Sequence, residues 1–315
     1  MPVLTDLRTG RATVLLITNV AVDALRVRLH LLNGADWSSV DFACEVGSSE
    51  TVPFSFEPSD SGLEASFTCA GVAASHALEM REGIAFFTAE RLLTGATTNG
   101  NLLLGEAHVF GRRAGTALSL DAIVFQGPDV NAPGAGDRTY RFDGIEYSHA
   151  PGALATAFFA PSRRGRIGIG TELILFTLDG TPGLPPQART SLTSFDSAGE
   201  AVSASHAFSG FDVVALDEID SRFSSERLGK TTGHLLLTPE VTEQLDGQHD
   251  ALHDGGIGSD GVRKIPIFGW IVHSGRRALV DGKRVRGRTS WGRALDWSFT
   301  PLVPTVGDIV TFAAE

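Results

Sequence analysis

The stretch Leu25-Arg26-Val27-Arg28-Leu29-His30-Leu31 has an apolar residue at every second position and basic residues in the gaps. A β-strand has this period of two, because its successive side chains point to opposite faces of a sheet. The same alternation recurs at Val52, Phe54 and Phe56, and again over residues 202–208. The sequence therefore predicts half-buried strands, each with one face in a core.

Turn-forming residues interrupt these runs throughout the chain of 315 residues, which has 36 Gly and 14 Pro. Only Ser75–Arg81 and Pro239–Leu245 have a pattern that favours a short helix. Short strands separated by frequent turns are typical of antiparallel sandwiches. The predicted fold class is all-β, with antiparallel β-sandwich domains of an Ig-like or jelly-roll-like kind.

The chain also contains an internal repeat, which predicts two domains of related structure. Three segments of the first half match three of the second half in the same order: Thr13-Val-Leu-Leu-Ile-Thr18 with Glu172-Leu-Ile-Leu-Phe-Thr177, Gly83-Ile-Ala-Phe-Phe-Thr88 with Gly233-His-Leu-Leu-Leu-Thr238, and Gly111-Arg-Arg-Ala114 with Gly275-Arg-Arg-Ala278. We predict a tandem duplication, with domains at residues 1–135 and 136–315.

A polar insertion distinguishes the second half from the first. Between Glu240 and Gly269 lie 28 residues, against 14 between Glu90 and Gly105, and the surplus is the segment 242–261. Its candidate metal ligands are Asp246, His249, Asp250, His253, Asp254 and Asp260. Aspartates and loop carbonyls could hold a structural Ca²⁺, or the histidines a transition metal. A solvated acidic loop is the alternative, and no other cofactor is expected.

A basic run with neighbouring tryptophans lies near the C-terminus. Its candidate ligand- or partner-binding residues are Arg276, Arg277, Arg284, Arg286, Arg288, Trp291 and Trp297. Arginine pairs with anionic groups and tryptophan stacks on sugar rings, so an acidic partner, another copy of this acidic chain or a polysaccharide could bind there. A half-exposed strand would show the same alternation. The net charge of −11 disfavours nucleic acid as a partner.

Two further side chains receive structural interpretations. His206 is in register with Val202, Ala204 and Phe208, which predicts a histidine that faces the core with its polar atoms satisfied. Trp270 lies beside Phe268 in a segment matched by the repeat, and we predict that it is buried.

The cysteines and the ends of the chain bear on its location. Cys44 and Cys69 lie in strand-like contexts of the first domain, either as a buried thiol pair or as a disulfide, which would require an oxidising compartment. No apolar run approaches the roughly 20 residues of a membrane-spanning helix. The first residues lack the charged head and apolar region of a signal peptide.

The chain resembles uncharacterised secreted bacterial proteins built from tandem β-sandwich units. The resemblance is carried by the strand ending in Thr18-Asn19, the pattern Leu192-Thr-Ser-Phe195-Asp and the glycine-led strand Gly233-His-Leu-Leu-Leu. It implies an extracellular or cell-surface location and supplies no catalytic residue.

Catalytic motifs are missing from the sequence. There is no Gly-x-Ser-x-Gly elbow and no glycine-rich phosphate loop between a strand and a helix. Our leading hypothesis is a non-enzymatic extracellular or cell-surface structural protein that acts by self-assembly or adhesion, through sheet edges or the basic and acidic surfaces. The alternative is a polysaccharide-binding module with structural Ca²⁺. A metal-dependent hydrolase at His249 and His253 is a third hypothesis.

Overall fold

A computed structural model describes residues 1–8, 10–92, 102–111, 116–124, 153–162, 169–177, 185–240, 267–275, 278–280, 283–285 and 289–295. These residues form antiparallel sheets, with 68% of residues in strands and 6% in helices. The predicted all-β sandwich class is confirmed. The predicted boundary at residue 135 lies outside the described residues.

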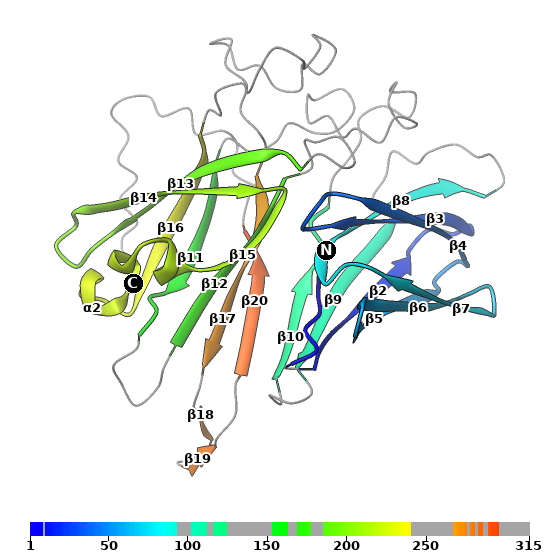
Figure 1. The fold of residues 1–315 in the computed structure, drawn as a ribbon, viewed down its shortest axis with the longest axis horizontal. Coiled ribbons are helices and arrows are strands. Elements are labelled where there is room, and N and C mark those ends of the chain that lie inside the picture. The colour runs from blue at the N-terminus through cyan, green and yellow to red at the C-terminus, as the bar shows by residue number, and fades with distance from the viewer. Residues whose placement is uncertain are drawn as a thin grey trace, which may run out of the picture.

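The first domain is a sandwich of two sheets (Figure 1). Sheet A contains, in spatial order, β1 (Pro2–Leu4), β8 (Glu82–Arg91), β3 (Leu25–Asn33) and β4 (Ser39–Val46). Sheet B contains β10 (Thr116–Asp121), β9 (Leu103–Gly111), β2 (Arg11–Asn19), β5 (Thr51–Ser59), β6 (Gly62–Cys69) and β7 (Val72–Leu78). The alternation read in β3 is confirmed, since Leu25, Val27, Leu29 and Leu31 are buried while Arg26 and Arg28 are exposed.

The second domain is also built from two sheets. Sheet C contains β11 (Leu154–Phe159), β16 (Thr232–Pro239), β13 (Gln187–Phe195) and β14 (Ala201–Ser209). Sheet D contains β15 (Phe211–Ala215), β12 (Ile169–Phe176), β17 (Phe268–Gly275) and β20 (Thr289–Ala294). A two-stranded ribbon, β18 (Ala278–Val280) with β19 (Lys283–Val285), joins β17 to β20. The helical turns are α1 (Leu216–Ile219), η1 (Ser221–Phe223) and α2 (Ser225–Leu228).

The two domains share one strand order. Sheets A and C correspond strand for strand, with β1, β8, β3 and β4 in the places of β11, β16, β13 and β14. In sheets B and D, the run β10-β9-β2-β5 corresponds to β20-β17-β12-β15. The matched segments of the repeat fall on β2 and β12, on β8 and β16, and at the ends of β9 and β17. This agreement supports the duplication, which stays a prediction.

The two domains differ in the segment that follows β5 in the first domain and β15 in the second. The first domain inserts the hairpin β6–β7 after β5, so that sheet B is two strands wider than sheet D. The second domain has α1, η1 and α2 in the same place, after β15. The helix predicted over Ser75–Arg81 is therefore wrong, because residues 75–78 pair with β6 as part of β7. Pairing across the hairpin overrides the local pattern.

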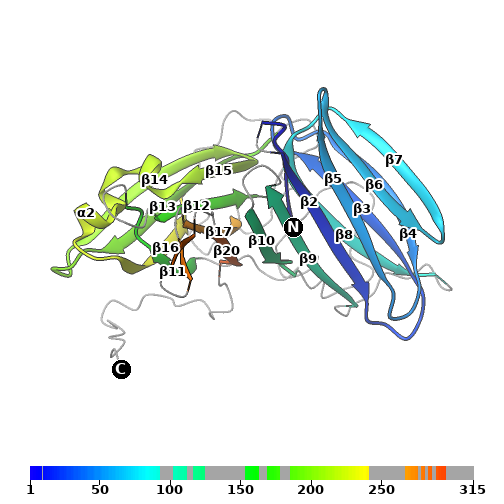
Figure 2. The ribbon, with the colours of Figure 1, turned by 90° about the horizontal axis from the view of Figure 1, so that it is seen from below.

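The domains pack against each other through an apolar interface. Strand β12 of sheet D is buried on both faces, since its Leu173 and Leu175 lie in the core of the second domain, whereas the alternate residues Ile174 and Phe176 join a cluster with the first domain. This double burial explains why residues 173–176 of β12 form a continuous apolar run. The edge strands β10 and β20 lie side by side in both ribbon views (Figures 1 and 2).

Two tryptophans join the domains. Trp270 of β17 is fully buried, as predicted, and its indole Nε1 donates a hydrogen bond of 2.9 Å to the backbone oxygen of Asp121 in the first domain. Trp37 follows β3 and is also buried, at 1% exposure. Its ring covers Gly210 of the second domain, where a Cβ atom would lie 2.5 Å from the ring. The contact therefore requires glycine at position 210.

Gly210 tests this interface directly. Gly210→Ala should cost about 1–3 kcal/mol more unfolding free energy than Gly199→Ala, because only the first substitution forces a methyl group into Trp37. Both glycines have a positive φ, 64° and 83°, so the backbone strain is shared, and a Cβ at Gly199 meets no atom within 4 Å. Denaturant unfolding of both variants measures the difference. Equal losses would contradict the close contact.

Candidate functional site

Most of the predicted ligand-binding residues lie outside the described part of the chain. This holds for the insertion, with Asp246, His249, Asp250, His253, Asp254 and Asp260, and for Arg276, Arg277, Arg286, Arg288 and Trp297. Arg284 lies in β19 and Trp291 in β20, opposite His273, but the surroundings of their side chains are not described. Among the described residues, no group of three or more His, Cys, Asp or Glu could hold a metal ion.

The two cysteines form a disulfide. Cys44 of β4 and Cys69, the last residue of β6, have sulfur atoms 1.98 Å apart and Cα atoms 5.4 Å apart. The sequence left open a buried thiol pair or a disulfide, and the structure contains the disulfide. The bond connects sheet A to the hairpin β6–β7, the element of the first domain that has no strand counterpart in the second. The edge strand of sheet A is thus joined covalently to β6, the strand next to the edge of sheet B.

The free edges of sheets differ in how they are protected. An edge strand presents unpaired backbone N–H and C=O groups, which proteins block with charges, proline or a covering segment. The edge strand β4 has the charged residues Asp41 and Glu45. Two other edge strands, β10 and β20, lie against each other between the domains. The edges β7, β11 and β14 have no charged residue and no proline, but in β11 the Phe159 carbonyl accepts a hydrogen bond from the Thr171 hydroxyl.

The β14 edge has a cap from the helical segment. The guanidinium of Arg222 donates a hydrogen bond of 2.8 Å from Nη2 to the backbone oxygen of Ser203 in β14. Asp220 holds that guanidinium through three hydrogen bonds of 2.7–3.1 Å, from Nε and Nη2. These bonds to Arg222 also lower the pKa of the Asp220 carboxyl below its usual value. A backbone acceptor of β14 is therefore occupied by a side chain of its own chain.

The β7 edge has no such cap within the described residues. Strand β7 has seven residues, Val72-Ala-Ala-Ser-His-Ala-Leu78, and pairs only with β6. Five of the seven are exposed, and Val72 leaves 69% of its surface open to solvent. The strand lies at the outer side of the first domain, away from the second domain (Figures 1 and 2). Within the described residues, it is an edge strand with neither a charge nor a cap.

A tight turn and an aromatic contact hold the hairpin β6–β7 in shape. At its tip, Ala70 and Gly71 both have positive φ, 48° and 78°, the conformation of a two-residue type I′ turn. Within the sandwich, the ring of His76 in β7 lies 4.8 Å from the ring of Phe42 in β4 and stacks on Phe67 of β6. Through His76, β7 therefore contacts strands of both sheets, which holds it in the sandwich.

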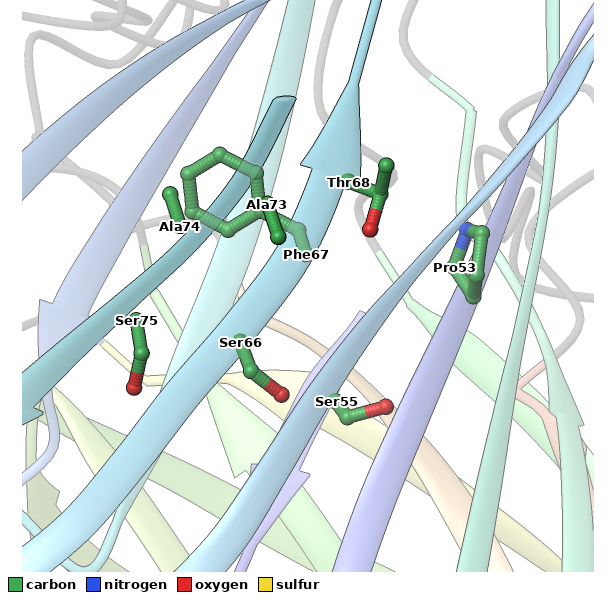
Figure 3. A pocket seen from close by; sticks show the side chains of 8 residues that line it. All are labelled: Pro53, Ser55, Ser66, Phe67, Thr68, Ala73, Ala74 and Ser75. Carbon is green, nitrogen blue, oxygen red and sulfur yellow. The ribbon is translucent and has the colours of Figure 1, made fainter. Parts of the chain in front are cut away.

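A shallow groove of small side chains adjoins the β7 edge. It has a volume of about 370 Å³ and lies over β5, β6 and β7 (Figure 3). Its lining residues are Pro53, Ser55, Ser66, Phe67, Thr68, Ala73, Ala74 and Ser75. Ser55 pairs with Ser66, and Ser66 with Ser75, so three serines form one row across three strands. The Ser75 hydroxyl donates to the Glu64 carboxylate at 2.5 Å.

The outer face of sheet A is different, because it is charged. Arg26 lies 3.8 Å from Glu45, and Arg28 lies 3.4 Å from Glu90. His30 Nδ1 is 3.0 Å from the Asp41 carboxylate. Exposed pairs of this kind contribute little stability, but they keep a sheet face solvated. The charged face and the small, uncharged groove thus lie on opposite sides of one sandwich.

No protein-family model matches this chain. A search of curated proteins found no match either. No helix in the described part of the chain combines the length and the apolar character needed to cross a membrane.

His206, Asp212 and Glu82 form a cluster of polar side chains between the two domains. His206 has a polar partner at Nε2, an Asp212 oxygen 2.7 Å away, its ring stacks on Phe208, and its side chain is 17% exposed. Partial burial raises the pKa of Glu82 in β8, although Glu82 still reaches solvent, and the negative charge of Asp212 raises it further. The two carboxylates thus repel each other weakly across the interface.

Arg222 gives a test of edge protection. We expect Arg222→Ala to increase the initial rate of aggregation severalfold, because the Ser203 carbonyl and the uncharged β14 edge lose their cap. Arg227→Ala is the matched control, since it removes the same charge from the exposed surface of α2. Light scattering at equal protein concentration measures both. Similar rates for the two variants would mean that the Arg222 contact does not protect the edge.

Proposed function

We propose that the protein is a non-enzymatic structural protein of the extracellular space or cell surface that acts by self-association. The observation that carries this proposal is the β7 edge, seven residues long, with neither charge nor proline. An edge of this kind is a template for another strand, and such edges are normally blocked. The β14 edge, which is equally uncharged, has a cap. The uncharged β11 edge has its Phe159 carbonyl bonded to the Thr171 hydroxyl, so in the described part of the chain β7 is the uncharged edge without such a bond.

Two further features support the proposal. The Cys44–Cys69 disulfide is of a kind that persists in oxidising compartments, which favours an extracellular location. It also fixes the hairpin that presents the edge. The hairpin occupies the place that a helical segment takes in the second domain, so the open edge is an addition to the strand order that the domains share.

The measurement is the molar mass of the purified protein over a wide range of concentration. We expect the molar mass to rise with protein concentration. Ala73→Lys, on the exposed side of β7, should shift the midpoint of self-association to a concentration roughly tenfold higher or more, because a charge on an edge strand opposes pairing. Ala43→Lys, on the exposed side of β4, is the matched control and should behave as wild type. A wild-type protein that stays monomeric at every concentration would overturn the proposal.

The polysaccharide-binding and metal-dependent alternatives depend on Trp291, Trp297 and the segment 242–261. Neither the surroundings of these side chains nor that segment is described, so no structural observation favours either alternative.

A further inference from the structure

We infer that the strand that pairs with β7 is β7 of a second copy, antiparallel and in one register, with the twofold axis at Ser75. This inference rests on the proposed self-association and specifies its interface. In a twofold dimer the same patch serves both subunits, so the strand must be complementary to itself. The residues of β7 can be compared with this requirement position by position.

The sequence of β7 is nearly symmetric about Ser75. Antiparallel pairing on that residue places Ala73 opposite the partner's Ala77, Ala74 opposite the partner's His76 and Val72 opposite the partner's Leu78. Ala73 then faces another alanine, and Val72, which is 69% exposed, meets a leucine. No charged residue of either strand opposes another. The registers displaced by one residue would place inner side chains on the outer face.

The two faces of the sheet continue across this pair. On the outer face, Ser55, Ser66 and Ser75 form a row, which the partner's Ser75, the partner's Ser66 and the partner's Ser55 would extend in line. On the inner face, Leu78 pairs with the buried Leu63, so the partner's Val72 would extend an apolar row. Two six-stranded sheets would thus join into one continuous sheet, with hydroxyl groups on one side and apolar groups on the other.

Strands β14 and β4 fit a β7 partner less well than β7 itself. Strand β14 shares the sequence Ala-Ser-His-Ala with β7, at residues 204–207 and 74–77, but its Ser203 carbonyl is bonded to Arg222. Strand β4 presents Asp41 and Glu45, which a second acidic copy would repel. Pairing of β7 with itself closes after two copies, whereas pairing with β14 would continue as a filament. The expected product is a discrete dimer.

Cysteine cross-linking tests the register. In Ser75→Cys the two new thiols would face each other with Cα atoms about 4.5–5.5 Å apart, within disulfide range. Oxidised glutathione would take up the two electrons and be reduced to two thiols. In Ala73→Cys the equivalent atoms are offset by four residues, about 13 Å along the strand, which is too far. We expect Ser75→Cys to cross-link at least about tenfold faster than Ala73→Cys, by non-reducing gel.

Mixed samples and charge exchange give independent readouts. An equal mixture of Ala73→Cys and Ala77→Cys should form heterodimers, because these positions oppose each other in the proposed register. In Ala73→Lys/Ala77→Lys, like charges would oppose each other twice and raise the dimerisation midpoint roughly tenfold or more. Ala73→Glu/Ala77→Lys should restore it, since each new glutamate would face a new lysine across the pair, and the lysine introduced at position 77 would lie beside Glu64.

The outcomes separate the two proposals. A wild-type protein that never associates overturns the proposed function and this interface together. A wild-type protein that associates, while Ser75→Cys cross-links no faster than Ala73→Cys and the Glu/Lys variant does not recover, overturns the Ser75-centred pair alone. Because the charge-exchange variants keep Ser75 and its bond to Glu64, a folding defect of Ser75→Cys would still leave the register decided.

Discussion

Trp270→Ala is expected to lower the free energy of unfolding by about 3–5 kcal/mol and to separate the unfolding of the two domains. The side chain is fully buried, stacks on Phe176 with ring centroids 5.3 Å apart, and belongs to the cluster shared with the first domain. Its removal leaves a large cavity where the domains meet. It also leaves the backbone oxygen of Asp121 without the indole donor.

Two controls distinguish coupling from simple loss of core. Phe223→Ala removes a fully buried ring from the core of the second domain, so it should cost a similar amount without uncoupling the domains. Trp270→Phe keeps most of the apolar contact and loses the hydrogen bond, at a cost of about 1–3 kcal/mol. Calorimetry measures all three. One coincident transition in Trp270→Ala would contradict the coupling role of this residue.

The strands and the buried faces could be predicted from the sequence because they depend on local periodicity. The alternation in β3 identifies its inner residues, and the match between the ends of β9 and β17 points to two domains of related order. Trp270 could be predicted as buried, but not as a contact between domains. Whether the outer face of sheet D meets solvent or another domain is decided by packing between distant segments, which periodicity does not report.

The candidate site could not be predicted in the same way. The pattern of residues 75–78 favours a helix, since Ala and Leu are good helix formers, whereas their pairing with β6 makes them a strand. An edge becomes visible only after every strand has been paired, because nothing local marks β7 as last in its sheet. The one available signal is the absence of charge over the residues between Cys69 and Glu79 in an otherwise acidic chain.

Reduction of the Cys44–Cys69 disulfide should lower the stability of the first domain by about 3–4 kcal/mol. The bond closes a loop with a sequence separation of 25 residues, and without it the unfolded chain gains the entropy of opening that loop. Because both cysteines lie in the first domain, the loss should fall on that domain. Denaturant unfolding of the wild-type protein, with and without reductant, measures the change in a single sequence.

The same bond should also govern self-association. Strand β7 pairs only with β6, and the disulfide ties the end of β6 to sheet A, so reduction should allow the hairpin to open locally before the domain unfolds. A hairpin that opens presents its edge for a smaller fraction of the time, and we expect the association midpoint to rise upon reduction. Cys44→Ala/Cys69→Ala should show this weakened association with and without reductant. If the reduced wild-type protein associates as tightly as the oxidised protein, the edge does not depend on the disulfide, and the packing of His76 against Phe42 and Phe67 suffices to hold it in place.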